Sequence, residues 1–491
     1  MTQLSTAVPN SSIRSAVGIQ TNFKDYRSGV PVLPQRLDVL TMVSTGVTPS
    51  AFDDPIQYFN EVSVANDAGF GSPAHLMAIQ IFSRFGDNVG GVPVYFHYVE
   101  AGGTDVAATG QIALTGTQTA TKEYTITIND ISATVTIESG DTAAAAATKI
   151  KNAIDAVLEM PITTVVSTSD VDLTAKWEGE TGNDLTVAIS GDVAGITFAL
   201  TQFTGGTGNG DVTDALASVA NDWVTMFVSM FDDSTNLDLI QAEGERKWGS
   251  LVKLPFINFI GSNETDPTTA STLSESRKDD RISSQISAPG APALPFEIAS
   301  RAVGLITSRA NNQAARAYSG LKLLGLTAGA TSYQWSFTEG DAAEKRGAST
   351  SVVKNSVIVL EDILTFYHPD GEVDPGYRYV VDIVKLQNII FTIENKFDSD
   401  EWVGTTLLDD NDISTQSFVR KPKDAKAALF GLADNWGLLA YITDVDFTKE
   451  NMQVQKASGV RNRIEAVVPV KLSDTLRQQA YDLNYGFDIR S

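Results

Sequence analysis

The last residues of the chain alternate between apolar and polar side chains. The apolar series is Tyr481, Leu483, Tyr485, Phe487 and Ile489, and each member is followed by a polar residue or glycine, up to the final Ser491. A period of two is typical of a β-strand with one apolar face. Because free chain ends usually fray, we expect this strand to join a sheet, which the pattern alone does not identify.

A second alternating stretch lies near the start of the chain. Its apolar members are Ile13, Val17, Ile19 and Phe23, with polar residues between them. The following segment, KDYRSGVPVLPQ (24–35), is punctuated by Gly and Pro and is expected to be extended. We therefore predict an N-terminal arm and linker over 1–34 that contains a strand at about 13–23.

Between these ends the pattern is that of an α/β domain. The segments 36–43 and 92–99 are typical of buried strands, and the helical stretch 75–85 between them completes a βαβ unit. The pattern resumes with a strand at 223–231, a helix at about 235–247, a strand at 251–261, a polar loop over 262–290, a helix from Pro295 and strands within 357–367. We predict a core domain in two parts, 35–100 and 206–370.

The stretch 101–205 differs in composition from both flanks. It contains no arginine, and 4 Lys stand against 13 Asp and Glu. Short strands rich in Thr, Val and Ile, such as KEYTITIND and ISATVTIES, surround an alanine-rich helix over 141–158 with Asp141 as its expected N-cap. This pattern predicts an inserted, strand-rich domain on the outside of any assembly.

The C-terminal part combines long helices with a few strands. Helices are predicted over 377–397 and 422–436, the second with Pro422 in its first turn and Gly437 just past its end. Two strands at about 441–448 and 463–472 precede a short helix in SDTLRQQA (473–480). We predict a domain over 371–480 and a C-terminal arm over 481–491, which makes the whole chain a multidomain α/β (α+β) protein.

Composition excludes several classes of function. The 491 residues are 42% hydrophobic with a mean hydropathy of −0.05, and no apolar run reaches the length of a membrane span. The first fifteen residues lack the pattern of a secretory signal, so a soluble chain is expected. The net charge of −24 argues against nucleic acid and anionic membranes as partners.

Candidate chemistry is sparse. The chain has no cysteine, and its three histidines, His75, His97 and His368, are too far apart to share a helical turn. GGTGNG (205–210) lacks the residues that close a phosphate loop, and LLDDNDIS (407–414) lacks the glycine and glutamate of a calcium loop. A flexible linker and an exposed acidic loop explain these two motifs. We predict no catalytic, cofactor or metal site.

One cluster of charge stands out. Residues 420–491 carry 11 Lys and Arg against 9 Asp and Glu, in a strongly acidic chain. Arg420, Lys421, Lys423 and Lys426 gather at the start of a predicted helix, where the helix dipole disfavours cations. Either an external anionic partner or a solvated basic face accounts for them.

Four segments in this order resemble the tail sheath proteins of contractile-tailed bacteriophages, in particular the Mu-like branch. They are SSIRSAVGIQTNFKDYRSGVPVLPQRLDVL, the insert with SGDTAAAAATKIKNAI, WSFTEGDAAEKRGASTSVVKNSVIVLEDILTFY, and NRIEAVVPVKLSDTLRQQAYDLNYGF. Their order and spacing carry the resemblance, which covers most of the chain.

The resemblance implies a structural subunit that polymerises around the tail tube and contracts to drive the tube through the host envelope. Its implied partners are other copies of the chain in a helical or stacked-ring sheath, the tail tube protein, and the baseplate and tail terminator proteins. The implied location is the phage tail of the virion, after assembly in the host cytoplasm. Neither nucleic acid nor membrane insertion is implied.

The resemblance also assigns roles to the two ends. Terminal strands of sheath proteins join small sheets on neighbouring subunits, so the donors here would be Ile13, Val17, Ile19 and Phe23 with Tyr481, Leu483, Tyr485, Phe487 and Ile489. The host sheet would include Ile464, Ala466, Val468 and Val470, although Pro469 cannot donate a ladder hydrogen bond. The tube contact would be made by Arg420, Lys421, Lys423 and Lys426.

Two other classes remain open at this point. A receptor-binding or decoration protein of the tail would account for the strand-rich insert. A tail-associated hydrolase would require a cleft with coupled carboxylates. Formation of filaments by the purified protein would separate a sheath subunit from both.

Overall fold

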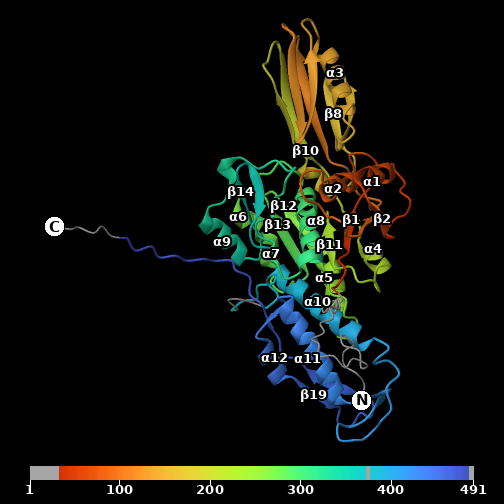
Figure 1. Ribbon diagram of the computed structural model, residues 1–491. Coiled ribbons are helices and arrows are strands. Elements are labelled where there is room, and N and C mark those ends of the chain that lie inside the picture. The colour runs from red at the N-terminus through yellow and green to blue at the C-terminus, as the bar shows by residue number, and fades with distance from the viewer. Residues whose placement is uncertain (1–31, 372–375, 486–491) are drawn as a thin grey trace, which may run out of the picture.

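A six-stranded sheet forms the centre of the computed structural model, which describes residues 32–371 and 376–485 (Figure 1). The strand order is β13-β12-β11-β1-β3-β2, built from β1 (Leu37–Thr41), β2 (Ile56–Tyr58), β3 (Val94–Tyr98), β11 (Met226–Ser229), β12 (Ile257–Ser262) and β13 (Ser283–Ser287). Neighbouring strands are parallel, except that β2 runs antiparallel to β3. Every residue of β1, β11, β12 and β13 is buried, as in parallel sheets covered on both faces.

Helices pack around this sheet. They are α1 (Glu61–Ala68), α2 (Pro73–Ile81), α4 (Thr213–Ser218), α5 (Ser234–Trp248) and α8 (Pro295–Gln313). Helix α8 lies along β11 and β12 and packs against α2. Pro73 and Pro295 each occupy a first helical turn, where the missing N–H has no partner to lose. The parallel pairing of β1 with β3, with α2 between them in sequence, agrees with the predicted βαβ unit.

The predicted polar loop over 262–290 is wrong in part. This stretch contains α6 (Pro267–Ala270), α7 (Thr272–Ser276) and the buried edge strand β13. The sequence SSQIS of β13 is mostly polar, but two of its side chains are hydrogen-bonded inside the protein: Ser284 Oγ donates to Leu364 O at 2.6 Å and Gln285 Nε2 donates to Ala270 O at 2.6 Å. Downstream lie a 3₁₀ turn η2 (Thr331–Tyr333), α9 (Phe337–Lys345), β14 (Ser351–Lys354) and β15 (Val357–Leu360).

The inserted segment folds as two sheets and one helix at one end of the molecule (Figure 1). One sheet has the order β10-β4-β8-β7, with β4 (Thr109–Gly116), β7 (Ile162–Ser167), β8 (Asp170–Ala175) and β10 (Ile196–Thr204); the other has the order β6-β5-β9, with β5 (Lys122–Ile128), β6 (Ile131–Ile137) and β9 (Val187–Ser190). Helix α3 (Ala143–Asp155) packs on β6, β7 and β8, and a 3₁₀ turn η1 (Glu180–Asp184) follows them. The N-cap of α3 is Thr142 rather than the predicted Asp141, which instead pairs with Lys149 at 2.7 Å.

The C-terminal part lies at the opposite end from the insert (Figure 1). It consists of α10 (Val380–Phe397), β16 (Thr406–Leu407), β17 (Val419–Arg420), α11 (Pro422–Leu438), β18 (Ile442–Thr443), α12 (Val445–Asn451), β19 (Gln453–Lys456), β20 (Ile464–Val467) and β21 (Lys471–Leu472). Three predictions are wrong here. The expected strand at 441–448 is interrupted by α12, which Asp444 caps by accepting a hydrogen bond from Phe447 N at 3.1 Å. The expected helix over 473–480 is extended chain, and α11 continues past Gly437 to Leu438.

One hydrophobic core runs through all three parts. Trp177 of the insert is fully buried, with its ring centroid 6.1 Å from that of Phe296 in α8. Trp436 of α11 is also fully buried and donates from Nε1 to Thr392 Oγ1 of α10 at 2.8 Å. The insert and the C-terminal part are therefore joined to the centre by packing as well as by the chain. Within residues 32–371 and 376–485, no helix is long and apolar enough to cross a membrane.

Candidate assembly surfaces

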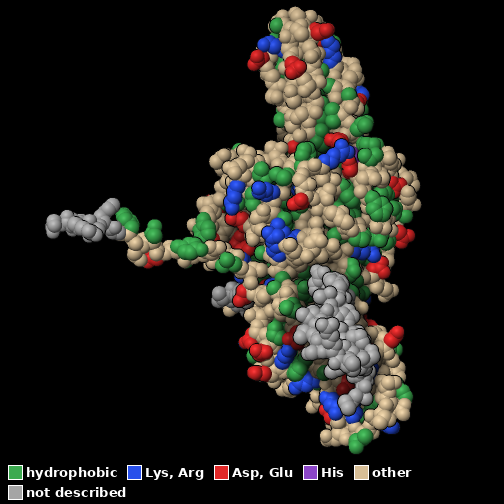
Figure 2. All heavy atoms as spheres, in the orientation of Figure 1, with side chains coloured by type: hydrophobic (Ala, Val, Ile, Leu, Met, Phe, Trp, Pro, Cys, Tyr) green, Lys and Arg blue, Asp and Glu red, His purple; other side chains and the backbone are tan. Residues whose placement is uncertain are grey.

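The C-terminal segment leaves the body of the protein as an extended chain. Residues 473–485 project sideways in Figure 1, and Figure 2 shows apolar side chains along them. Tyr481, Leu483 and Tyr485 are each at least 83% exposed. Apolar side chains of this size are rarely left in water without a partner surface, since burying them yields about 25 cal/mol per Å². Phe487 and Ile489, the other two predicted members of this strand, lie outside the described residues.

The predicted N-terminal donor residues Ile13, Val17, Ile19 and Phe23 also lie outside the described residues, so their role stays a prediction. The described chain begins at Val32, and the next residue, Leu33, is buried. The N-terminal segment thus contacts the body at Leu33, and the C-terminal segment leaves the body at Ser473.

The predicted host residues fall on two short antiparallel pairings. Ile464 and Ala466 belong to β20, which pairs with β19, while Val468 and Val470 lie between β20 and β21 and pack partly against the core. β21 in turn pairs with β18, through Ile442 opposite Leu472. Ile464 pairs with Lys456, and Leu472 pairs with Ile442, so residues 464–472 run antiparallel to residues 442–456 in both pairings. Helix α12 interrupts the partner chain between the two pairings.

These two pairings leave strand edges open. In the described parts of the chain, β18–β21 and β19–β20 are each two-stranded, and no third strand joins them. Val467 is 63% exposed. An isolated two-stranded hairpin is only marginally stable in water, and an exposed edge accepts another strand. The predicted host region therefore has the geometry of an incomplete sheet.

The basic cluster at the start of α11 has anionic partners within the chain. The Asp410 carboxylate accepts a hydrogen bond from Lys423 N at 2.9 Å, and Lys423 Nζ donates to Asp410 O at 3.2 Å. Lys421 Nζ donates to Asp412 O. The acidic loop that contains both aspartates thus places negative charge at the helix N-terminus, where the dipole favours it.

The other two members of the cluster contact aromatic rings. Arg420 lies over Trp402, with Cζ 5.6 Å from the ring centroid, and Lys426 Nζ lies 5.5 Å from the centroid of Phe430. An external anion is therefore not needed to explain cations at this helix start. Their contact with a tube stays a prediction.

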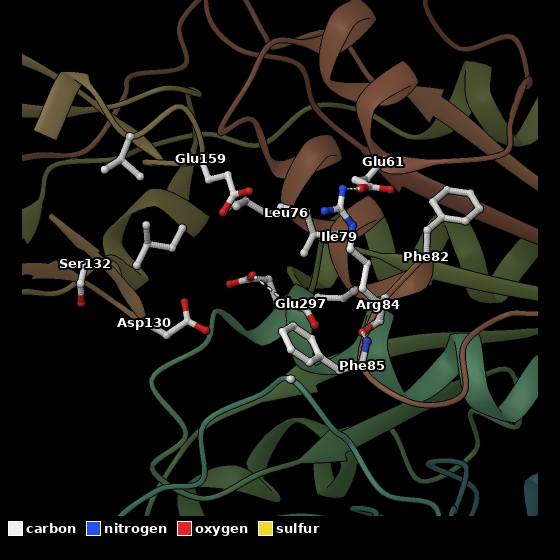
Figure 3. Close-up of a pocket in the computed structure, with 15 residues that line it drawn as sticks. Glu61, Leu76, Ile79, Phe82, Arg84, Phe85, Asp130, Ser132, Glu159 and Glu297 are labelled. Atoms are coloured by element: carbon white, nitrogen blue, oxygen red, sulfur yellow. Dashed lines mark hydrogen bonds and ion pairs between the residues drawn. The ribbon is translucent and has the colours of Figure 1, made fainter.

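A cavity of about 510 Å³ separates the insert from the centre of the protein (Figure 3). Asp130 and Glu159 of the insert face it from one side, and Glu297 of α8 faces it from the other. Glu297 is buried, and its carboxylate accepts from Leu294 N at 3.0 Å and from Gln80 Nε2 at 3.4 Å. The cation in the lining, Arg84, pairs with Glu61.

Burial sets the charge state of these carboxyls. Burial, together with the nearby Asp130, raises the pKa of Glu297 from 4.5 to about 8. Burial, with Glu159 nearby, also raises the pKa of Asp130. Both shifts favour the neutral form of the carboxyl groups at this cavity.

Glu297→Gln is expected to reduce the pH dependence of stability. Because the folded pKa is raised, the unfolded chain ionises first as pH increases from about 4.5, and the folded state loses about 1.4 kcal/mol of relative stability per pH unit until the folded pKa is reached. Glutamine stays neutral and removes this slope. Thermal unfolding midpoints measured between about pH 5 and about pH 8 test the prediction. Glu123→Gln, at an exposed position of β5 away from the cavity, is the control, and parallel pH profiles of E297Q and the unchanged protein would contradict the prediction.

The histidines and the two loop motifs contact other groups of the chain. His97 is buried, with Nε2 2.9 Å from Asp38 Oδ2 and Nδ1 2.7 Å from Asp53 O, and His368 Nδ1 lies 2.6 Å from Phe366 O. GGTGNG leaves the insert beside the bridge between Val106 and Thr207, and the Asp409–Asp412 loop contacts α11 as described above. No group of three or more His, Cys, Asp or Glu among residues 32–371 and 376–485 is placed to hold a metal ion.

Comparison with known proteins identifies the class. No family model matches the sequence. The chain is 24% identical over 386 residues to the Mu-like prophage FluMu tail sheath protein of Haemophilus influenzae, covering 77% of this chain and 79% of that protein. The sheath of an extracellular contractile injection system, in its contracted state, has the same fold, with a TM-score of 0.50 at 9% identity over 98% of this chain and 99% of that one. The sheath tail protein of Desulfitobacterium hafniense aligns with a TM-score of 0.49 at 14% identity, over 94% and 97% of the two chains.

The protein is a structural subunit of a contractile tail or sheath-like system. Over most of its length the chain is similar to a tail sheath protein, which is a structural, non-enzymatic kind of protein. The resemblance found in the sequence is thereby confirmed.

Proposed function

We propose that this subunit polymerises around a tail tube in an extended, metastable state and contracts to drive the tube through a host envelope. One observation carries the proposal: an apolar C-terminal segment extends away from its own subunit, while small sheets at the base of the same subunit have open edges. In a polymer of identical chains, the segment of one copy can complete the sheet of the next, so each copy gives and receives a strand.

The energetics suit repeated strand exchange. Each backbone hydrogen bond of an added strand contributes roughly 0.5–1.5 kcal/mol. Each buried apolar side chain adds on the order of 1.5–3 kcal/mol before ordering costs. Because the linking segments are covalent parts of each subunit, neighbours stay connected while the folded bodies rotate and slide. Contraction then needs no nucleotide, since the energy is stored in the extended lattice during assembly.

The charges at the two ends of the subunit support one orientation in the sheath. The insert carries net negative charge and lies at one end of the molecule, and the C-terminal part with the basic helix α11 lies at the other (Figure 1). We place the insert outward and the C-terminal part against an acidic tube. Tail tube, baseplate and terminator proteins are then the partners, and the tail of the virion is the site of action.

Charge reversal at Lys423 and Lys426 tests both parts of the proposal. The purified chain, imaged by electron microscopy, is expected to form tubular polymers, and Lys423→Glu with Lys426→Glu should keep these polymers. The double variant should lose decoration of isolated tail tubes, and the difference from the unchanged protein should be largest at low salt, because salt screens the interactions of exposed charges.

Lys345→Glu with Lys354→Glu, on the exposed surface of the core domain, is the control with the same change in charge. Tube decoration equal to that of the unchanged protein would reject these tube-contact residues. Absence of any polymer from the unchanged, folded chain would reject the sheath function itself.

A further inference from the structure

One turn of helix α10 contains a lysine that is fully buried. The Lys385 side chain has no exposed surface, and its ammonium donates to Ser473 O at 2.5 Å and pairs with Asp382 at 2.9 Å. Burying an ammonium group costs several kcal/mol unless polar partners replace its water. A buried lysine that contacts the first residue after β21 therefore fixes the place where the C-terminal segment leaves the body.

Asn388, three residues further along the same helix, binds the start of the described chain. Asn388 is fully buried, and its Oδ1 accepts a hydrogen bond from Leu33 N at 3.1 Å. Leu33 is the second residue of the described chain, at the inner end of the N-terminal segment. Residues three apart in a helix are neighbours on its surface, about 5–6 Å between Cβ atoms, so both chain ends meet α10 at one place.

Tyr441 links the two contacts. Its Oη donates to Asn388 Oδ1 at 3.4 Å, and its carbonyl accepts from Ser473 N at 3.1 Å. Ser473 Oγ also donates to Ala440 O at 2.5 Å. Ser473 is thereby held through its N–H, its carbonyl and its hydroxyl.

Helix α10 is itself held rigidly. Gln387 Nε2 donates to Pro255 O at 3.0 Å in the centre of the protein, and Thr392 Oγ1 accepts from Trp436 Nε1 of α11 at 2.8 Å. A second contact lies further along the C-terminal segment, where the Arg477 guanidinium stacks on Tyr379 with Cζ 3.4 Å from the ring centroid. The turn is thus fixed to both large parts of the subunit.

We propose that Lys385 and Asn388 are positioning residues that hold both exchanged arms at a common point. The inference rests on the proposed function, since it assumes that both ends pair with neighbours. Tension from one neighbour then passes to the other through a single turn of a rigid helix, and the domains on either side can reorient without changing the spacing between subunits.

Lys385→Met is the direct test, with Lys396→Met as the matched control. Lys396 lies on the same helix, partly exposed, and pairs with Glu401 instead of an arm. In K385M, hydrogen exchange over residues 470–478 should rise by about tenfold, the effect of losing one hydrogen bond, and polymers should become shorter after shear. K396M should match the unchanged protein in both measurements.

Arg477→Gln covers the case in which K385M fails to fold. Arg477 is exposed, so R477Q keeps the monomer stable, yet it removes the stacking on Tyr379 and should also shorten sheared polymers. Normal exchange and normal polymer length in folded K385M would overturn the inference, as would normal R477Q polymers if K385M does not fold. Either result leaves strand exchange intact, because the unchanged chain would still polymerise and the arm deletion described below would still prevent it.

Discussion

Removal of residues 481–491 is expected to abolish polymerisation and to leave the monomer nearly unchanged in stability. Tyr481, Leu483 and Tyr485 are exposed side chains on an extended segment, so their own subunit loses little burial when they are removed. We expect a stability change within about 0.5 kcal/mol, as for surface substitutions. A neighbouring subunit, by contrast, loses a whole strand of backbone hydrogen bonds and a row of apolar contacts.

Electron microscopy and light scattering measure the loss of polymer, and thermal unfolding measures the monomer. Tyr485→Asp with Phe487→Asp is the matched variant, because it keeps the backbone length and removes only the apolar face. If the strand paired instead within its own subunit, the deletion would uncover a sheet edge and lower the melting temperature clearly. Ordered tubes formed by a chain lacking both 1–24 and 481–491 would exclude strand exchange.

The central sheet could be predicted because its signals are local. β1, β3, β11 and β12 are apolar runs between turns, and α8 begins at a proline, so composition alone places them. β13 could not be predicted in this way. Ser284 and Gln285 donate to Leu364 O and Ala270 O, which are distant in the sequence and become neighbours only in the fold.

The host region shows the same limit. Strand-like alternation was visible at 463–472, but α12 replaces the second half of the predicted partner strand because Asp444, at a positive φ of 52°, starts a helix that packs on α11. The expected helix at 473–480 is extended because Ser473 is bonded to α10 and to Tyr441. Tertiary contacts override helix propensity in this segment.

Some charged sites could be predicted from the sequence, and others could not. The cluster Arg420 to Lys426 lies within seven residues and is visible in the sequence. Its contact with Asp410, in the preceding acidic loop, could not be predicted. Glu297 and Lys385 gave no signal, since a single charged residue in an amphipathic helix is usually exposed. Only the fold shows that Glu297 faces Asp130 across a cavity and that Lys385 faces Ser473.

Trp177→Ala is expected to have the largest effect of any single substitution considered for this chain. Trp177 lies in the insert, fully buried against Phe296 of α8, and its Nε1 donates to Thr181 Oγ1 at 2.9 Å. The neighbouring Lys176 also joins the insert to the centre, through Nζ to Phe70 O at 2.7 Å and through its carbonyl to Thr45 N at 2.6 Å. Truncation leaves a cavity at this junction and an unpaired hydroxyl, so we expect a loss of about 3–5 kcal/mol in the free energy of unfolding.

The assembly of this variant separates the role of the insert from that of the arms. Trp177 lies at the insert, while Leu33 and Ser473 leave the body near α10, so folded W177A subunits should still form tubes at temperatures below their lowered melting point. Leu158→Ala, at an exposed position of the insert, should change stability by no more than about 0.5 kcal/mol and is the control. A loss below about 1 kcal/mol in W177A would show that the insert is joined to the centre chiefly by the chain rather than by packing. Failure of folded W177A to form tubes would show that the insert takes part in subunit contacts, and would reject its outward placement.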